Sequence, residues 1–208
     1  MMVDQPKELG APRRIGRPRS EAAGAHDAIM DAVYTLLKHR SVRDLSMEAV
    51  AKRAGVGKPT LYKWWPSKAA LVFAMFHERL ARQPEALTAA TVEEFMRYRV
   101  RRLIEEFHDL FGKVIAELIA EGQSDPKVLQ ELYDQHIGVR RAHAIVEFEK
   151  GKRSGEFKAD TDAAVLVDQI FGPIYYRMML RILPLDYAFG DTLLDQVLSG
   201  VRKKKPIS

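Results

Sequence analysis

Residues 46–71, SMEAVAKRAGVGKPTLYKWWPSKAAL, predict two short helices joined by a tight glycine turn. Ser46 is a good N-cap for the first helix, and Gly55 stands where a residue with positive φ can end it. Soon afterwards Pro59 fits the first turn of a second helix, where a missing N–H costs nothing. That helix would stop near Pro66. This order of elements is the helix-turn-helix pattern.

The second helix of this pattern has one face for packing and another that is free for DNA. Leu61 and Trp65 are four positions apart and should both face the core. The opposite face could then enter a major groove about 12 Å wide. Lysine can donate to guanine and apolar groups can touch a thymine methyl, whereas hydroxyl, indole and ammonium groups suit phosphate oxygens. We expect base contacts from Lys58, Pro59 and Tyr62, and phosphate contacts from Ser46, Thr60, Lys63, Trp64 and Lys68. The alternative is a pair of ordinary core helices joined by a glycine turn.

Positive charge gathers at the N-terminal end of the chain. Residues 1–80 carry 14 Lys and Arg against 8 Asp and Glu, whereas the net charge of the whole chain is +5. Residues 1–20 are rich in Pro and Gly and indicate a flexible arm. An arm of this kind can enter a narrow minor groove. Its candidate contacts are Arg13, Arg14, Arg17 and Arg19. The alternative is a solubilising tail.

The other segments also have helical periodicity, and no stretch alternates convincingly as a strand does. We therefore predict an all-α fold of about nine helices. Helices are expected at 22–39 and 67–82, around Val92–Phe107, Val114–Ile119 and Leu129–Val146, and at 162–182 and 190–203. Pro84 marks the change from one half to the other. The predicted organisation is an arm at 1–20, a DNA-binding domain at 21–82 and a helical body at 83–208.

Composition excludes several classes of protein and site. The chain has no cysteine, so it can form neither a disulfide framework nor a thiolate metal site. Its longest apolar run, Ala69–Phe76, is far shorter than the roughly 20 residues of a membrane helix. With no secretory signal found either, we expect a soluble, cytoplasmic protein. Glu105 and His108 have the spacing of a di-iron ligand pair, but no second copy follows, so an enzyme is disfavoured. We expect no cofactor and no metal.

The helix-turn-helix stretch resembles the signature of the TetR family of bacterial transcriptional regulators. The resemblance is dense over residues 25–80, and Phe171–Arg177 is similar to segments near the dimerising helix in some members. It implies three N-terminal helices for DNA and a body for ligand sensing and dimerisation, with the base and phosphate roles given above. Trp64 stands where the family more often has Tyr or His, and Gly57 where Ser or Thr is common.

Two further predictions concern the body. A two-fold dimer would read the half-sites of a palindrome. Its interface is expected to use Ile170, Ile174, Met178, Leu193, Leu194, Val197 and Val201. A small apolar effector would enter between the helices at 92–150 and release a repressor from its operator. The candidate pocket residues are Phe95, Tyr98, Phe107, Phe111, Tyr133 and Tyr176. The alternatives are plain core packing of these side chains and an architectural or protein-controlled regulator that has no small-molecule effector.

Overall fold

The computed structural model describes residues 19–81 and 89–203, and these residues form helices with short connections. Arg13, Arg14 and Arg17 of the expected arm lie outside the described residues, as does the expected boundary between 82 and 83. The helices are α1 Arg19–His39, α2 Met47–Ala54, α3 Lys58–Trp64, α4 Lys68–Ala81, α5 Val92–His108, α6 Leu110–Gly122, α7 Pro126–Leu132, the π-helical segment η1 Tyr133–Ile137, α8 Gly138–Ser154, α9 Ala163–Leu180 and α10 Tyr187–Ser199.

The all-α prediction is confirmed for the described residues. The β-type pairing found among them is an isolated bridge between Phe157 and Arg202. The junction residues Leu132, Tyr133 and Gly138 keep right-handed helical φ and ψ, so α7, η1 and α8 form one continuous helix. Counted in this way, the helices within 19–81 and 89–203 number nine. None of the described helices combines the length and the apolar character needed to cross a membrane.

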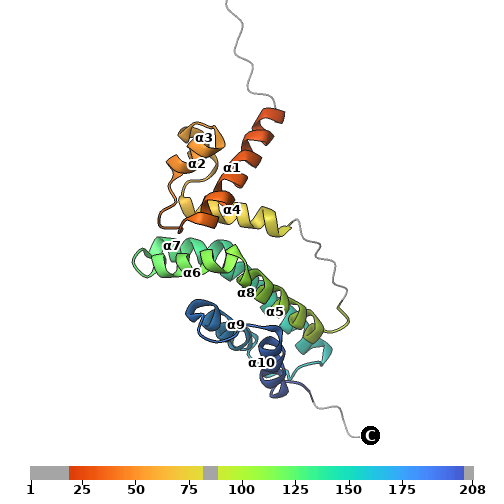
Figure 1. Cartoon of the computed structure of the whole chain (residues 1–208). Coiled ribbons are helices and arrows are strands. Elements are labelled where there is room, and N and C mark those ends of the chain that lie inside the picture. The colour runs from red at the N-terminus through yellow and green to blue at the C-terminus, as the bar shows by residue number, and fades with distance from the viewer. Residues whose placement is uncertain (1–18, 82–88, 204–208) are drawn as a thin grey trace, which may run out of the picture.

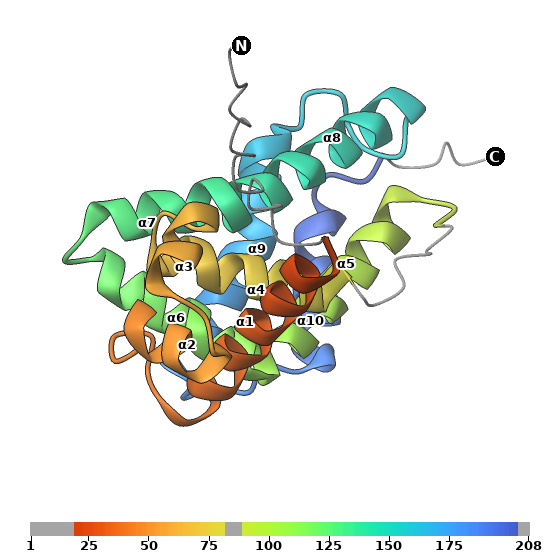
Figure 2. The ribbon, with the colours of Figure 1, turned by 90° about the horizontal axis from the view of Figure 1, so that it is seen from above.

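The helices form successive layers along the molecule (Figure 1). Helices α1–α3 gather at one end, α4 lies beneath them, and α6 and α7 follow before α5 and α8. Helices α9 and α10 close the other end. In the view from above, α2 and α3 lie over α6 and α7 (Figure 2). The apolar stripe of α1, with Ile29, Val33 and Leu37 fully buried, joins this end to the rest of the core.

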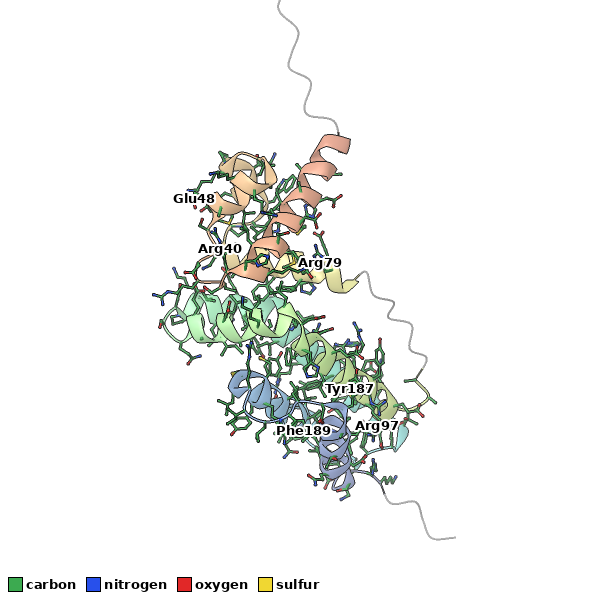
Figure 3. All side chains as sticks on the ribbon, in the orientation of Figure 1. Arg40, Glu48, Arg79, Arg97, Tyr187 and Phe189 are labelled. Carbon is green, nitrogen blue, oxygen red and sulfur yellow. The ribbon has the colours of Figure 1, made fainter. Side chains whose placement is uncertain are left out.

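Helix α10 is attached to α5 by charged and polar contacts at the edge of the core. The Arg97 guanidinium donates to Asp191 at 3.1 Å and to Asp195 at 2.8 Å. The Tyr187 hydroxyl donates to Glu105 at 2.6 Å. Figure 3 shows Arg97 and Tyr187 at this junction. Helix α10 begins at Tyr187, three residues before the expected start, because Asp186 caps it by accepting from the Phe189 N–H at 2.8 Å.

The expected dimer interface stays a prediction, but four of its residues fill the core of the monomer itself. Ile170, Ile174, Met178 and Leu194 are buried within this chain and offer nothing to a partner. Leu193, Val197 and Val201 are half-buried against the same core. The reason is that α9 packs on α8, α5 and α6, and α10 packs on α5 and α9, so the strongest apolar stripe of each helix faces inward. The apolar side chains left exposed along the end of α9 and the following turn are Tyr176, Met179, Leu180, Ile182 and Leu183.

Candidate nucleic-acid interface and ligand cavity

The turn between α2 and α3 has the predicted construction. The Ser46 hydroxyl accepts from the Ala49 N–H at 3.1 Å and caps α2. Gly55 ends α2 with φ of +66°, a conformation that a side chain would disfavour. Gly57 precedes α3 without a side-chain cap, and Pro59 occupies the first turn of α3. Leu61, which is fully buried, fixes α3 against the bundle. The short glycine turn therefore holds α3 at a set angle to α2.

The outer face of α3 is open among the described residues. Lys58, Pro59, Tyr62 and Lys63 are exposed, and Thr60 is half-buried. The exposed fraction of Tyr62 is 47%, which is high for an aromatic side chain. In Figure 2 the ribbon of α3 faces the viewer at this end of the molecule. The predicted base-contacting residues thus share one accessible surface, which we call the α3 surface.

Lys58 interacts with two neighbouring side chains, Glu48 and Tyr62. Its ammonium donates to Glu48 of α2, and it lies 5.7 Å from the centre of the Tyr62 ring. The hydrogen bond from Lys58 lowers the pKa of Glu48, and the same bond raises the pKa of Lys58. Both groups therefore stay charged at neutral pH. Lys58 would have to leave Glu48, or share it, in order to reach a base.

Trp64 is half-buried, and its ring packs against other aromatic rings of the domain. Its ring lies 5.6 Å from that of His26 on α1 and 5.4 Å from that of Trp65. His26 in turn pairs with Glu78 of α4 at 2.6 Å. Trp64 is thus part of the packing that ties α3 to α1 and α4, and its contact with a phosphate stays a prediction.

Lys68 faces the body of the molecule. Its ammonium donates to the Val42 carbonyl at 2.8 Å and to Glu121 of α6 at 3.2 Å, and 24% of the side chain is exposed. This placement does not favour the expected phosphate contact of Lys68, which remains untested. Sequence reasoning missed this role because Glu121 lies 53 positions away and gives no local signal.

Lys68 belongs to a set of polar contacts between the α1–α2 connection and α6. Glu117 accepts from the Val42 N–H at 2.7 Å. Lys113 donates to the carbonyls of Leu37 and Arg40, at 3.2 and 3.0 Å, near the end of α1. Figure 3 shows Arg40 where this end of α1 meets α6. We call these contacts of Lys68, Lys113 and Glu117 the α6 junction, and they connect the helix-turn-helix unit directly to the body.

A cavity of about 340 Å³ lies between α5, α8 and α9. Much of its wall is apolar and includes Met96, Leu103, Val167 and Phe171. Polar groups also line it, at Arg99, Arg140, Arg141, Asp168 and Tyr175. Burial raises the pKa of Tyr175 to about 12, so its hydroxyl stays protonated at any ordinary pH.

The predicted pocket residues agree with this cavity at one position, Phe95. Phe107 and Phe111 stack within the core at 6.1 Å between ring centres. Tyr133 and Tyr176 are exposed, and Tyr98 is half-buried away from the described wall. These five residues do not line this cavity, and their contact with a ligand stays a prediction. For Tyr176 the reason is that one position on a helix turns a side chain by about 100°. It is therefore Tyr175, and not Tyr176, that lines the cavity.

His136 of η1 is almost completely buried, and its Nε2 atom has no hydrogen-bond partner among the described residues. Its ring lies 4.9 Å from that of Phe111. Burial lowers the pKa of His136 to about 3, helped by the positive charge of Arg140 and by His77 and Arg99. Within the described residues, no group of three or more His, Cys, Asp or Glu side chains is placed to hold a metal ion.

Comparison with known proteins gives consistent matches. The family described as "Bacterial regulatory proteins, tetR family" matches residues 29–75, and "Tetracyclin repressor-like, C-terminal domain" matches residues 96–197. The HTH-type transcriptional regulator YdeS of Bacillus subtilis (strain 168) is 36% identical over 90% of this chain and 93% of its own length.

Solved structures are similar over most of the chain. The TetR family transcription regulator SCO0332 has a TM-score of 0.71 at 29% identity, covering 86% of this chain and 99% of that protein. The regulator FadR from Bacillus subtilis in complex with stearoyl-CoA has a TM-score of 0.64 at 19% identity, covering 87% of this chain and all of that one. At 19% identity, the similarity to FadR shows a shared fold and no more.

Proposed function

The chain belongs to the TetR family of bacterial transcriptional regulators, and from this premise we propose that it is a ligand-responsive repressor that binds a palindromic operator as a homodimer. The observation that carries the DNA-binding part is the α3 surface, where Lys58, Tyr62 and Lys63 are exposed on a helix fixed from behind by Leu61. An exposed helix of this kind can enter the major groove and donate to base edges. As a DNA-binding regulator, the protein would act in the cytoplasm.

The operator can be found by selecting bound sequences from a pool of random DNA duplexes with the full chain. We expect enrichment of a sequence with two-fold symmetry, because each subunit of a dimer reads one half-site. Affinity for the selected duplex should fall steeply with salt as phosphate contacts release counterions. A pool that shows no enrichment after repeated rounds at low salt would contradict sequence-specific binding.

Dimerisation is proposed to use the exposed apolar side chains of α9 and the turn that follows it. Ile182 is the most exposed large apolar residue of the described chain, at 75%. Contiguous apolar exposure of this kind marks interaction surfaces in soluble proteins. We expect Ile182→Asp to shift sedimentation from dimer to monomer and to weaken operator binding. Val146→Asp on α8, at a position that is also exposed, is the matched control and should stay dimeric.

A small-molecule effector is supported by the cavity between α5, α8 and α9. The stearoyl-CoA complex of FadR provides a precedent for ligand binding on this fold. A ligand that binds one conformation of the dimer about a hundredfold more tightly shifts the equilibrium by about 2.7 kcal/mol, which is enough to change operator occupancy. The α6 junction is a physical route from the body to the helix-turn-helix unit. A cavity of this size favours a ligand-responsive regulator over an architectural or protein-controlled one.

A further inference from the structure

The charged side chains that line the cavity between α5, α8 and α9 already have partners within the chain. Arg141 makes a bidentate pair with Asp168, at 2.7 and 2.8 Å, and this pair lowers the pKa of Asp168. Arg140 donates to Glu106 at 2.7 Å. The third arginine of the wall, Arg99, is not without a partner either. Neither of the two arginines of α8 therefore calls for a bound anion.

The pair of Arg140 and Glu106 makes the wall unfavourable for a charged ligand of either sign. The side chain of Glu106 is 9% exposed. Its other cationic neighbour, Arg102, is 3.9 Å away and donates to Glu105 at 3.1 Å. An anion held by Arg140 would displace Glu106, and a cation held by Glu106 would displace Arg140. Either exchange leaves one charge of a largely buried pair without its partner, which is costly.

The Tyr175 hydroxyl differs from these groups, because it makes no hydrogen bond with any residue that the structure describes. Tyr175 lines the cavity and is half-buried, and its ring lies edge-on to Phe107 with 5.1 Å between the ring centres. Burial raises the pKa of Tyr175 to about 12, so the hydroxyl keeps its proton and can donate. A ligand without an acceptor would cover this donor and leave it unsatisfied, whereas an acceptor replaces the hydrogen bond that water offers.

We propose that the cavity binds an uncharged, mostly apolar ligand that carries a hydrogen-bond acceptor, such as a ketone, ester or lactone oxygen, for the Tyr175 hydroxyl. The apolar body of the ligand would pack against Phe95, Leu103 and Phe171. At about 340 Å³ the cavity is near the lower end of the range for ligand sites, so the ligand is small. The inference rests on the proposed function, because it names the chemical class of the effector.

The first experiment compares probes of one shape, titrated by calorimetry into the full-length protein at neutral pH. The ketone is 4-phenyl-2-butanone, the anion 3-phenylpropanoate, the cation 3-phenylpropylamine and the hydrocarbon 3-methylbutylbenzene. On a larger ring system, 2-acetonaphthone and 2-naphthoate repeat the comparison of ketone and anion. We expect each ketone to bind with a Kd at least about tenfold below those of the matched ions, because the charges of the wall are already paired. Ions that bind as tightly as the ketones, or the binding of neither ketone, would overturn the proposal.

Tyr175→Phe tests the assigned donor, since it removes the hydroxyl and keeps the ring beside Phe107. We expect the Kd for 4-phenyl-2-butanone to rise about threefold to tenfold, as for the loss of one neutral hydrogen bond, and the Kd for 3-methylbutylbenzene to stay unchanged. Tyr176→Phe, at the neighbouring exposed position outside the wall, is the matched control. An unchanged Kd for the ketone in Tyr175→Phe, or an equal loss for the ketone and the hydrocarbon, would exclude Tyr175 as the donor.

Filling the cavity tests its assignment as the site. Ala144 lines the wall and is buried, so Ala144→Leu should occupy the space that the ligand needs. Because filling a cavity commonly stabilises a fold, we expect Tm to stay the same or rise while the Kd for both ketones rises more than tenfold. Ala142→Leu, on the exposed face of α8, is the matched control. Ketone binding that survives in a folded Ala144→Leu variant would contradict this site, and the Tyr175 variant decides the question if Ala144→Leu does not fold.

Failure of the regulatory role can be distinguished from failure of the ligand inference. Ketone binding that depends on Tyr175 but does not change affinity for the selected operator would retain the ligand class and reject its role as effector. Operator binding with no calorimetric signal from either ketone would reject the ligand class and retain the DNA-binding function.

Discussion

Replacing Tyr62 with Ala should weaken binding to the selected operator by about 1–3 kcal/mol and relax sequence preference at one position of each half-site. Tyr62 stands near the middle of the α3 surface with 47% of its side chain exposed, so its removal leaves no cavity in the core. Alanine is also the better helix former, so α3 should persist. The loss would come from the base contact and not from unfolding. Competition binding with operator variants measures the effect at each position.

Lys63→Ala is the matched control on the same helix. Lys63 is exposed and was assigned to a phosphate, so its loss should weaken binding to all duplexes by a similar factor and reduce the salt slope by about one. Tyr62→Ala should leave the salt slope unchanged, because tyrosine carries no charge at neutral pH. If Tyr62→Ala lost as much affinity for random DNA as for the operator, its assignment as a base contact would have to be abandoned.

The local features of the helix-turn-helix unit were predictable because each depends on neighbours in the sequence. Ser46, Gly55 and Pro59 act within one turn of their own positions, through a cap, a positive φ and a fixed φ. The inward direction of Leu61 follows from helical spacing alone. For this reason the prediction from sequence and the structure agree on α2 and α3 nearly residue by residue.

The body was less predictable because its assignments depend on which helix packs on which. Ile174 and Met178 form a good apolar stripe, but the stripe alone does not say whether a partner subunit or α5 and α6 cover it. Tyr175 and Tyr176 differ by one position and face opposite environments. Likewise, the partners in the α6 junction are separated by 26 to 76 positions, and no local pattern joins them. Such contacts become visible only in the folded chain.

A buried neutral histidine makes the protein sensitive to acid. His136 has a pKa of about 3 in the folded state, because burial disfavours its charged form and Arg140, His77 and Arg99 add repulsion. An unfolded histidine has a pKa near 6.5. The unfolded chain therefore binds a proton first as the pH falls, and folding stability declines below pH 6.5 until the folded pKa is reached. At pH 5 the expected loss from this group is about 2 kcal/mol relative to neutral pH.

We expect His136→Leu to remove this part of the pH dependence. Leucine can pack against Phe111 and removes the Nε2 atom that has no partner, so the variant should be at least as stable as the wild type at pH 7.5. At pH 5 it should be more stable by about 2 kcal/mol plus any difference seen at pH 7.5. Urea unfolding at both pH values measures the change. His143→Leu, at an exposed position on α8, is the control and should lose stability in acid as the wild type does. If wild type and His136→Leu lost equal stability between the two pH values, the burial of His136 would not be what makes the fold acid-sensitive.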